Sequence, residues 1–82
     1  MKRSEIKDKV FTAVADVFCV MESTLTSGTV IGEDIWCDET DFNEFVCELD
    51  VKLGVDISEE LYLPVRILDV INTVENLLND KQ

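Results

Sequence analysis

Residues 38–54 read DETDFNEFVCELDVKLG, and this stretch predicts an amphipathic helix together with its start and its end. Asp38 is a favourable N-cap, because its carboxylate can accept a hydrogen bond from a free amide in the first turn. Glu39 and Asp41 follow in that turn, where the helix dipole stabilises negative charge. Gly54 then provides the left-handed residue that commonly ends a helix. The apolar positions recur at helical spacing, and they are Phe42, Phe45, Val46, Leu49 and Leu53.

Working outward, the same periodicity predicts a helix on each side of this stretch. Ser4 can cap a first helix over about residues 5–20, since Ser is a preferred N-cap. Its apolar positions are Ile6, Val10, Ala13, Val14, Val17 and Phe18. A last helix is defined by Ile67, Val70, Ile71, Val74, Leu77 and Leu78. Ser58 also predicts one short helical turn over residues 58–61, ending before Pro64 because proline displaces the preceding residue from the helical region.

The connection between the first two helices, residues 21–37, is rich in Ser, Thr and Gly and has no regular pattern. It is long for a structureless loop in a small domain. We therefore expect Val30, Ile31 and Ile35 to hold it against the core. Together these elements predict an all-α fold of four helices in a single domain, residues 1–82.

Four segments resemble motifs of the acyl carrier protein family. Residues 33–41, EDIWCDETD, are similar to the family's E-D-L-G-x-D-S-L-D. Residues 44–49, EFVCEL, resemble E-L-V-M-A-L, and residues 53–58, LGVDIS, resemble F-G-I-E-I-P. Residues 67–74, ILDVINTV, resemble V-x-D-L-I-D-Y-V. The resemblance covers nearly the whole chain and implies the family's four-helix bundle, with a long connection after helix I and a short helix III.

Glu39 stands where the family has its attachment serine. In that family the serine is esterified with 4′-phosphopantetheine, whose thiol carries the acyl group. A carboxylate keeps negative charge at the helix N-terminus but cannot form that phosphodiester. We therefore expect no phosphopantetheine and no other cofactor. Glu39 is either an ordinary first-turn residue, an imitation of the phosphate, or an engineered substitution, although the adjacent change of the family's leucine to Thr40 favours natural divergence.

Two neighbouring residues bear on this site. Thr40 is a weak alternative attachment hydroxyl, because it is rotated about 100° around the helix from position 39. Attachment there, or an engineered loss of the serine, would make the chain a working carrier of fatty acid, polyketide or related biosynthesis with 4′-phosphopantetheine. Trp36 occupies the family's glycine position. Its ring is expected either to fold over the edge of the core or to anchor a partner.

The chain contains three cysteines and no histidine. An odd number of cysteines without C-x-x-C spacing predicts reduced thiols, with neither a disulfide framework nor a zinc or other metal site. We expect Cys37 to be a partly buried loop residue whose thiolate is opposed by Asp34, Asp38 and Glu39. Cys19 and Cys47 are expected to fill core space.

The net charge is −11, from 18 acids and 7 bases. Such a field repels nucleic acid and anionic membranes and favours basic protein surfaces. Between Glu33 and Glu60 there are eleven acids and a single base, Lys52. The family resemblance implies that this helix docks on Lys/Arg patches of acyl- or peptide-assembly enzymes, although a merely solvated face remains the alternative. The candidate partner-binding residues are Trp36, Asp38, Glu39, Asp41, Glu44 and Glu48.

Other function classes are disfavoured. No nucleophile–base pair is visible, and a small bundle filled by Phe42 and Phe45 is expected to lack a cleft of the typical ~300 Å³ or more, so we expect no enzymatic activity. The N-terminal stretch has no apolar signal region and no apolar run approaches 18 residues, which predicts a cytoplasmic protein. We expect a monomer that acts as a non-carrying interaction or regulatory partner in acyl or peptide assembly.

Overall fold

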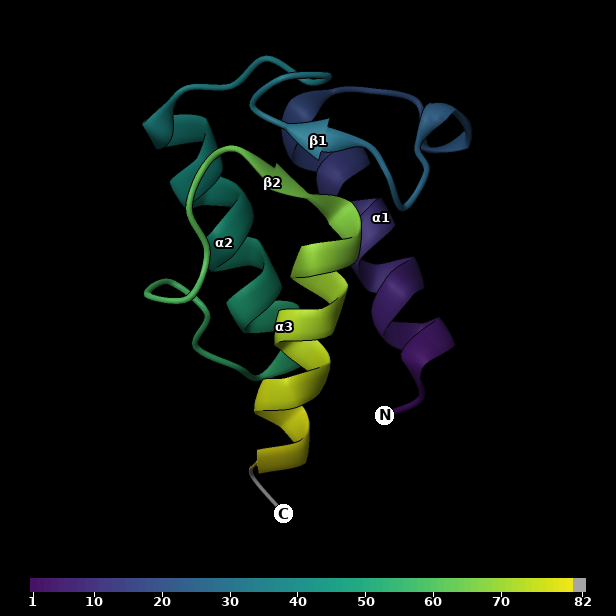
Figure 1. Ribbon diagram of the computed structural model, residues 1–82, viewed down its shortest axis with the longest axis vertical. Helices are drawn as coiled ribbons and strands as arrows, with labels where there is room; N and C mark the ends of the chain where they lie inside the picture. Colours follow the sequence, from purple (N-terminus) through teal and green to yellow (C-terminus); the bar gives the residue numbers. More distant parts are fainter. Residues whose placement is uncertain (81–82) are drawn as a thin grey trace.

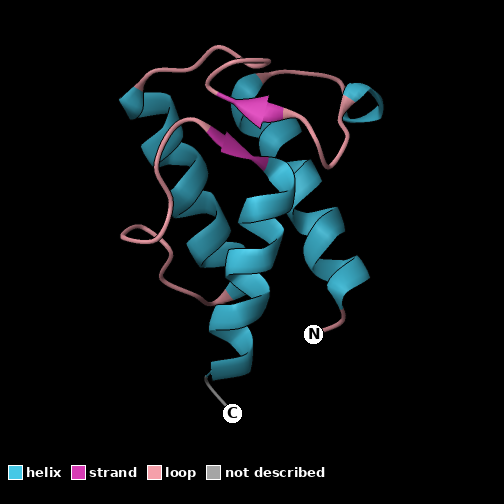
Figure 2. Ribbon diagram, in the orientation of Figure 1, coloured by secondary structure: helices cyan, strands magenta, loops and turns pink. Residues whose placement is uncertain are grey.

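The structure is a computed structural model that describes residues 1–80 (Figure 1). The described residues form helices α1 (Arg3–Phe18), α2 (Glu39–Leu53) and α3 (Ile67–Asp80), a 3-10 turn η1 (Glu22–Thr24), and strands β1 (Val30–Ile31) and β2 (Val65–Arg66). Helix α1 runs antiparallel to α2 and α3, and the strand pair covers the end of the bundle where α2 and α3 begin (Figure 2). The prediction of an all-α, four-helix fold is therefore confirmed only in part: the domain is mostly helical, but the described residues form three α-helices and a pair of short strands.

The apolar faces of the three helices meet in one core. All five apolar positions predicted for α2 are buried, and the buried residues of the described chain are all apolar. Phe45 is fully buried, with its ring centroid 5.5 Å from that of Phe18 and 6.0 Å from that of Phe42. Leu49 is also fully buried. The phenylalanine rings therefore pack in the core between α1 and α2.

The long connection is held as predicted, but by a strand pair that the sequence did not reveal. Val30 pairs with Arg66 and Ile31 with Val65 in an antiparallel register. Ile31 is fully buried, Ile35 is also buried, and Val30 is half-buried. Two-residue strands are too short to show an alternating pattern, since that signal needs at least four residues.

The same connection also caps the start of α3. The amide of Ile67 donates to the carbonyl of Thr29 at 2.9 Å, and the amide of Leu68 donates to that of Ser27 at 3.0 Å. The first amides of a helix lack partners within the helix, so these bonds satisfy two of them. The loop therefore fixes where α3 begins.

The short helix predicted over residues 58–61 is wrong, because this segment forms a turn. Ser58 does not cap a helix: its hydroxyl donates to Asp56 Oδ1 at 2.9 Å, and the amide of Glu60 donates to the carbonyl of Ile57 at 2.9 Å. A single helical turn fixes several residues for one hydrogen bond, so an aspartate that bonds locally easily outcompetes it. The turn leaves Leu61 buried in the core.

The predicted cap of the first helix is also wrong. Helix α1 begins at Arg3 with Lys2 as N-cap and without a side-chain cap bond. Arg3 draws this turn into the helix because its guanidinium reaches α3, donating to Asn72 Oδ1 at 2.7 Å and to Glu75 Oε1 at 3.1 Å. A contact between helices therefore overrides the local preference of Ser4.

No helix in the described part of the chain is long and apolar enough to cross a bilayer.

Helix α1 ends in a conformation that costs free energy. Cys19 is left-handed, with φ 55° and ψ 44°, and its amide donates to the carbonyl of Ala15. A side chain disfavours this region, whereas glycine adopts it freely.

We therefore expect Cys19→Gly to stabilise the domain by about 0.5–1 kcal/mol, measured as the shift in free energy of unfolding in urea. Gly54→Ala is the matched control, because Gly54 caps α2 with φ 66°, and it should destabilise the domain by a similar amount. A loss of stability in Cys19→Gly would show that the thiol makes a compensating contact.

Candidate functional site

The start of α2 is built as the sequence predicts. Asp38 has extended backbone angles, and its Oδ1 accepts the amide of Asp41 at 2.9 Å, so it is the N-cap. Its carbonyl accepts the amide of Phe42 at 3.0 Å. Glu39 is the first residue of the helix and is exposed to solvent. The position that resembles the attachment site is therefore an accessible carboxylate in the first helical turn.

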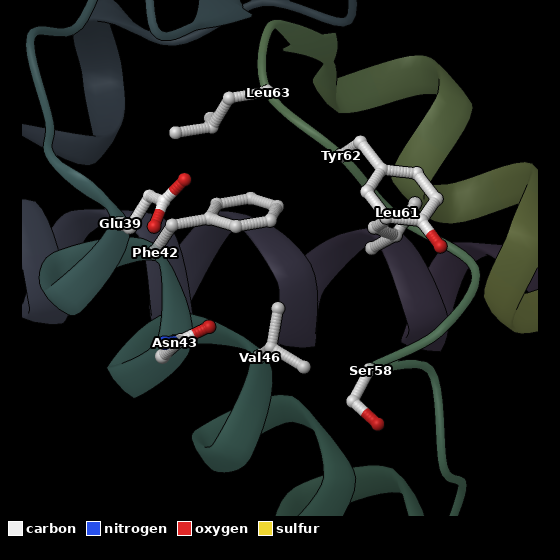
Figure 3. A pocket seen from close by; sticks show the side chains of 8 residues that line it. All are labelled: Glu39, Phe42, Asn43, Val46, Ser58, Leu61, Tyr62 and Leu63. Atoms are coloured by element: carbon white, nitrogen blue, oxygen red, sulfur yellow. The ribbon is translucent and has the colours of Figure 1, made fainter.

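Glu39 lies at the edge of a pocket of about 320 Å³. One wall is the start of α2 and the other is the segment 58–63, which includes the turn described above (Figure 3). Figure 3 shows the Glu39 carboxylate at one end and the hydroxyls of Ser58 and Tyr62 at the other. The lining residues are Glu39, Phe42, Asn43, Val46, Ser58, Leu61, Tyr62 and Leu63.

This pocket corrects the expectation that the bundle has no cleft of about 300 Å³. The hollow lies outside the filled interior, because Phe42 and Val46 form part of its wall while the fully buried Leu49 does not line it. A volume argument based on the core phenylalanines could not detect space between α2 and a loop.

Three local features hold the second wall in place. Asp50 of α2 accepts the amide of Ile57 on its Oδ1 at 3.0 Å, which ties the start of the wall to the helix. The hydroxyl of Tyr62 donates to the carbonyl of Glu59 at 2.9 Å. Gly32 has φ 102°, and a Cβ there would lie 3.3 Å from Leu63 Cδ2. Glycine is therefore needed where the long connection passes against Leu63.

The acids of α2 are divided between two flanks of the helix. At about 100° per residue, Asp41 lies about 200° around the axis from Glu39. Glu39 shares its flank with Asn43, which also lines the pocket. Asp41, Glu44 and Glu48 recur at steps of three and four and follow the other flank; we call these three residues the acidic stripe. The candidate partner-binding residues therefore do not form one patch.

The acidic stripe has no compensating bases among residues 1–80. None of Asp41, Glu44 and Glu48 has a Lys or Arg nitrogen within 4 Å in that part of the chain. Glu44 is exposed, while Asp41 and Glu48 are half-buried. The ion pairs in the described residues are Arg3–Glu75, Lys52–Asp16 and Arg66–Asp69. The stripe thus presents uncompensated negative charge.

Trp36 and Thr40 flank Glu39 in sequence, and both are exposed. The Trp36 side chain is 79% accessible, so the expectation that its ring folds over the core edge is wrong, while its role as a partner anchor stays a prediction. Thr40 is in the first turn of α2 but does not line the pocket. Its hydroxyl therefore does not occupy the place of Glu39.

The cysteines divide differently from the prediction. Cys37 is half-buried and packs against the core, as expected, but Cys19 and Cys47 are exposed. Cys19 lies beyond the end of α1, and Cys47 is about 100° around α2 from the buried Val46, which turns it to the outside. The prediction that these two fill core space is wrong.

The Cys37 thiol is expected to be the slowest of the three to react with iodoacetamide. Burial, then the negative charge of Asp41, then that of Asp38, raises the pKa of this thiol above its ordinary value. A raised pKa leaves less thiolate at a given pH, and the thiolate is the nucleophile. Mass spectrometry of partly alkylated protein should find Cys37 modified last, with its rate rising as pH increases.

Asp41→Asn is the informative variant, because Asp41 raises the pKa of the Cys37 thiol more than Asp38 does, and asparagine removes that charge at nearly the same size. It should speed Cys37 alkylation while leaving the rates of Cys19 and Cys47 unchanged. Preferential labelling of Cys37 in the unaltered protein at neutral pH would contradict this account.

Sequence reasoning found the α2 side of the site and missed the opposite wall. The sequence predicts a helical turn at Ser58 and gives no signal that Tyr62 and Leu63 line a pocket. The Asp56-x-Ser58 pair was the available signal, since aspartate commonly bonds the residue two positions on.

Within residues 1–80 no group of three His, Cys, Asp or Glu side chains is arranged to hold a metal ion. A comparison of the chain with protein-family models finds no match.

Proposed function

We propose that this protein is a carrier-like interaction partner that docks on enzymes of acyl or peptide assembly and transfers nothing itself. The observation that carries this proposal is the Glu39 carboxylate, exposed in the first turn of α2 at the position that resembles the attachment serine. It retains negative charge at the helix N-terminus and lacks the hydroxyl that the carrier cycle needs. The protein is thus proposed to act in the cytoplasm without cofactor or enzymatic activity.

The fold is part of the same proposal. Helices α1, α2 and α3 support it, because they lie in three of the segments where the acyl carrier protein resemblance implies helices. The turn at residues 58–60 stands where the family has its short helix. We infer a variant of the carrier arrangement in which this helix has been replaced by a turn.

The docking surface is assigned to the acidic stripe. Its three carboxylates have no basic partner within residues 1–80, and the chain carries a net charge of −11. Uncompensated charge of one sign accelerates association with a surface of the opposite sign. The exposed ring of Trp36, just before α2, offers an apolar contact beside it. Lysine- and arginine-rich patches on the partner enzymes complement this surface.

A second candidate function is a working carrier. The observation that favours it is the exposed hydroxyl of Thr40 in the first turn of α2. Attachment of 4′-phosphopantetheine there, or at a serine that Glu39 replaced by engineering, would restore acyl transfer. Against it stands the position of Thr40 away from the pocket that Glu39 lines.

The docking proposal predicts a strong effect of reversing charge on the stripe. In a binding assay with immobilised carrier-dependent enzymes that bear basic patches, Asp41→Lys with Glu44→Lys should slow association at least about 10-fold at low salt. The matched control is Glu5→Lys with Asp8→Lys on α1, which changes the net charge by the same amount at exposed positions. Equal effects of the two double variants, or no effect of either, would refute a role for the stripe.

A further inference from the structure

The pocket between α2 and segment 58–63 has an apolar wall, and the polar groups at its rim mostly accept hydrogen bonds. Phe42, Val46, Leu61 and Leu63 supply apolar surface. The volume of about 320 Å³ lies at the lower end of the roughly 300–1,000 Å³ typical of ligand pockets. At ~30 Å³ per water it corresponds to about ten waters. The space therefore suits one short alkyl chain.

The polar groups of the pocket accept hydrogen bonds more than they donate them. The Ser58 hydroxyl donates to Asp56 Oδ1, and the Tyr62 hydroxyl donates to the carbonyl of Glu59. Both protons are thus engaged, which leaves the two hydroxyl oxygens as acceptors. Glu39 adds a carboxylate, which also only accepts. Asn43 supplies the one lining side chain with uncommitted N–H groups, so a ligand rich in donors fits this edge.

The electrostatics of the pocket favour a cation at the Glu39 end. The lining contains no Lys or Arg. The N-terminus of α2 contributes about half a positive charge, but Asp38, Glu39 and Asp41 place three carboxylates on the same turn. The net charge of this first turn is therefore negative. An anionic head group would be repelled by this turn and by the net charge of −11.

We propose that this pocket binds an aliphatic ammonium ion without a covalent bond. The ammonium group lies against the Glu39 carboxylate and donates to it, and the alkyl chain lies over Phe42 and Val46 toward Leu61. Such a ligand matches the apolar wall and the negative charge at the Glu39 end together. An alcohol matches the wall but brings no positive charge, and a fatty acid brings a charge that this end repels.

Binding of this ion stands apart from the docking function, because the acidic stripe lies on the other flank of α2. A pocket that stays empty leaves the effect of charge reversal on docking intact. Loss of docking equally leaves the pocket chemistry intact.

The test is a titration of the full ¹⁵N-labelled chain followed by amide chemical shifts. The probes are n-octylammonium chloride, n-butylammonium chloride, n-octanol and sodium octanoate, each kept below micelle formation at low salt and pH 7, where the amine is protonated as a lysine is. Octylammonium should shift amides of residues 39–46 and 58–63. It should bind at least about 10-fold more tightly than butylammonium, because each buried methylene adds affinity, and more tightly than octanol or octanoate.

Glu39→Gln separates the charge from the shape of the pocket. It should weaken octylammonium about 2–5-fold, the range for one exposed ion pair, and leave octanol unchanged. Glu44→Gln, on the other flank of the same helix, is the matched control and should leave both unchanged. Octanol or octanoate binding as tightly as octylammonium, an unchanged affinity in Glu39→Gln, or shifts that avoid both walls would overturn the proposal.

Discussion

Phe45→Ala is expected to lower the free energy of unfolding by about 3–5 kcal/mol, the usual loss when a fully buried aromatic ring is removed. Phe45 has no accessible surface, and its ring lies between those of Phe18 and Phe42 at centroid distances of 5.5 and 6.0 Å. Because α1 and α2 meet at these rings, neighbouring side chains cannot close the space without moving a helix. A domain of this size has a total stability on the order of 5 kcal/mol. The variant should therefore retain no more than about 2 kcal/mol, with up to about half of the molecules unfolded at room temperature.

Urea denaturation followed by far-ultraviolet circular dichroism measures this loss. Val51→Ala is the matched control, since Val51 is on the same helix and 85% accessible, and it should change stability by no more than about 0.5 kcal/mol. Comparable losses in the two variants would mean that α2 does not bury the face described above.

The helices could be predicted because their signals are local. Periodic apolar positions and the Asp38 cap lie within one segment, and each of these α2 features is found in the structure. Ser4 failed as a cap because Arg3 bonds to Asn72 and Glu75, far along the chain. The pairing of β1 with β2 is equally non-local, since Ile31 and Val65 are paired although the whole of α2 separates them in sequence. Such contacts leave no trace in a short window of sequence.

The candidate site was predictable on one side only. The position of Glu39 follows from the cap and the helix start. Its separation from the acidic stripe follows only from the rotation of about 100° per residue together with knowledge of which face of the helix is buried. The pocket needs a second wall, and that wall depends on Ser58 bonding to Asp56 instead of starting a helix. The exposure of Trp36 could not be read from its type, because a tryptophan is equally suited to a core edge and to a partner surface.

Glu39→Ser is expected to convert the protein from one that cannot be modified into one that can. The substitution restores a hydroxyl to the exposed first turn of α2, where the helix N-terminus favours a phosphodiester. It should leave the fold unchanged, because Glu39 is exposed and makes no ion pair within residues 1–80. Adding Thr40→Ala to Glu39→Ser should preserve the modification, which would place the new bond at position 39 and not at Thr40.

The most direct measurement is the intact mass of the protein after incubation with coenzyme A and a phosphopantetheinyl transferase of broad specificity. The unaltered protein should keep its mass, and Glu39→Ser should gain the mass of one phosphopantetheine arm. Matching circular dichroism spectra would establish that both are folded. A gain of mass in the unaltered protein, or no gain in folded Glu39→Ser, would contradict the proposal that this is a carrier-like scaffold that lacks the attachment hydroxyl.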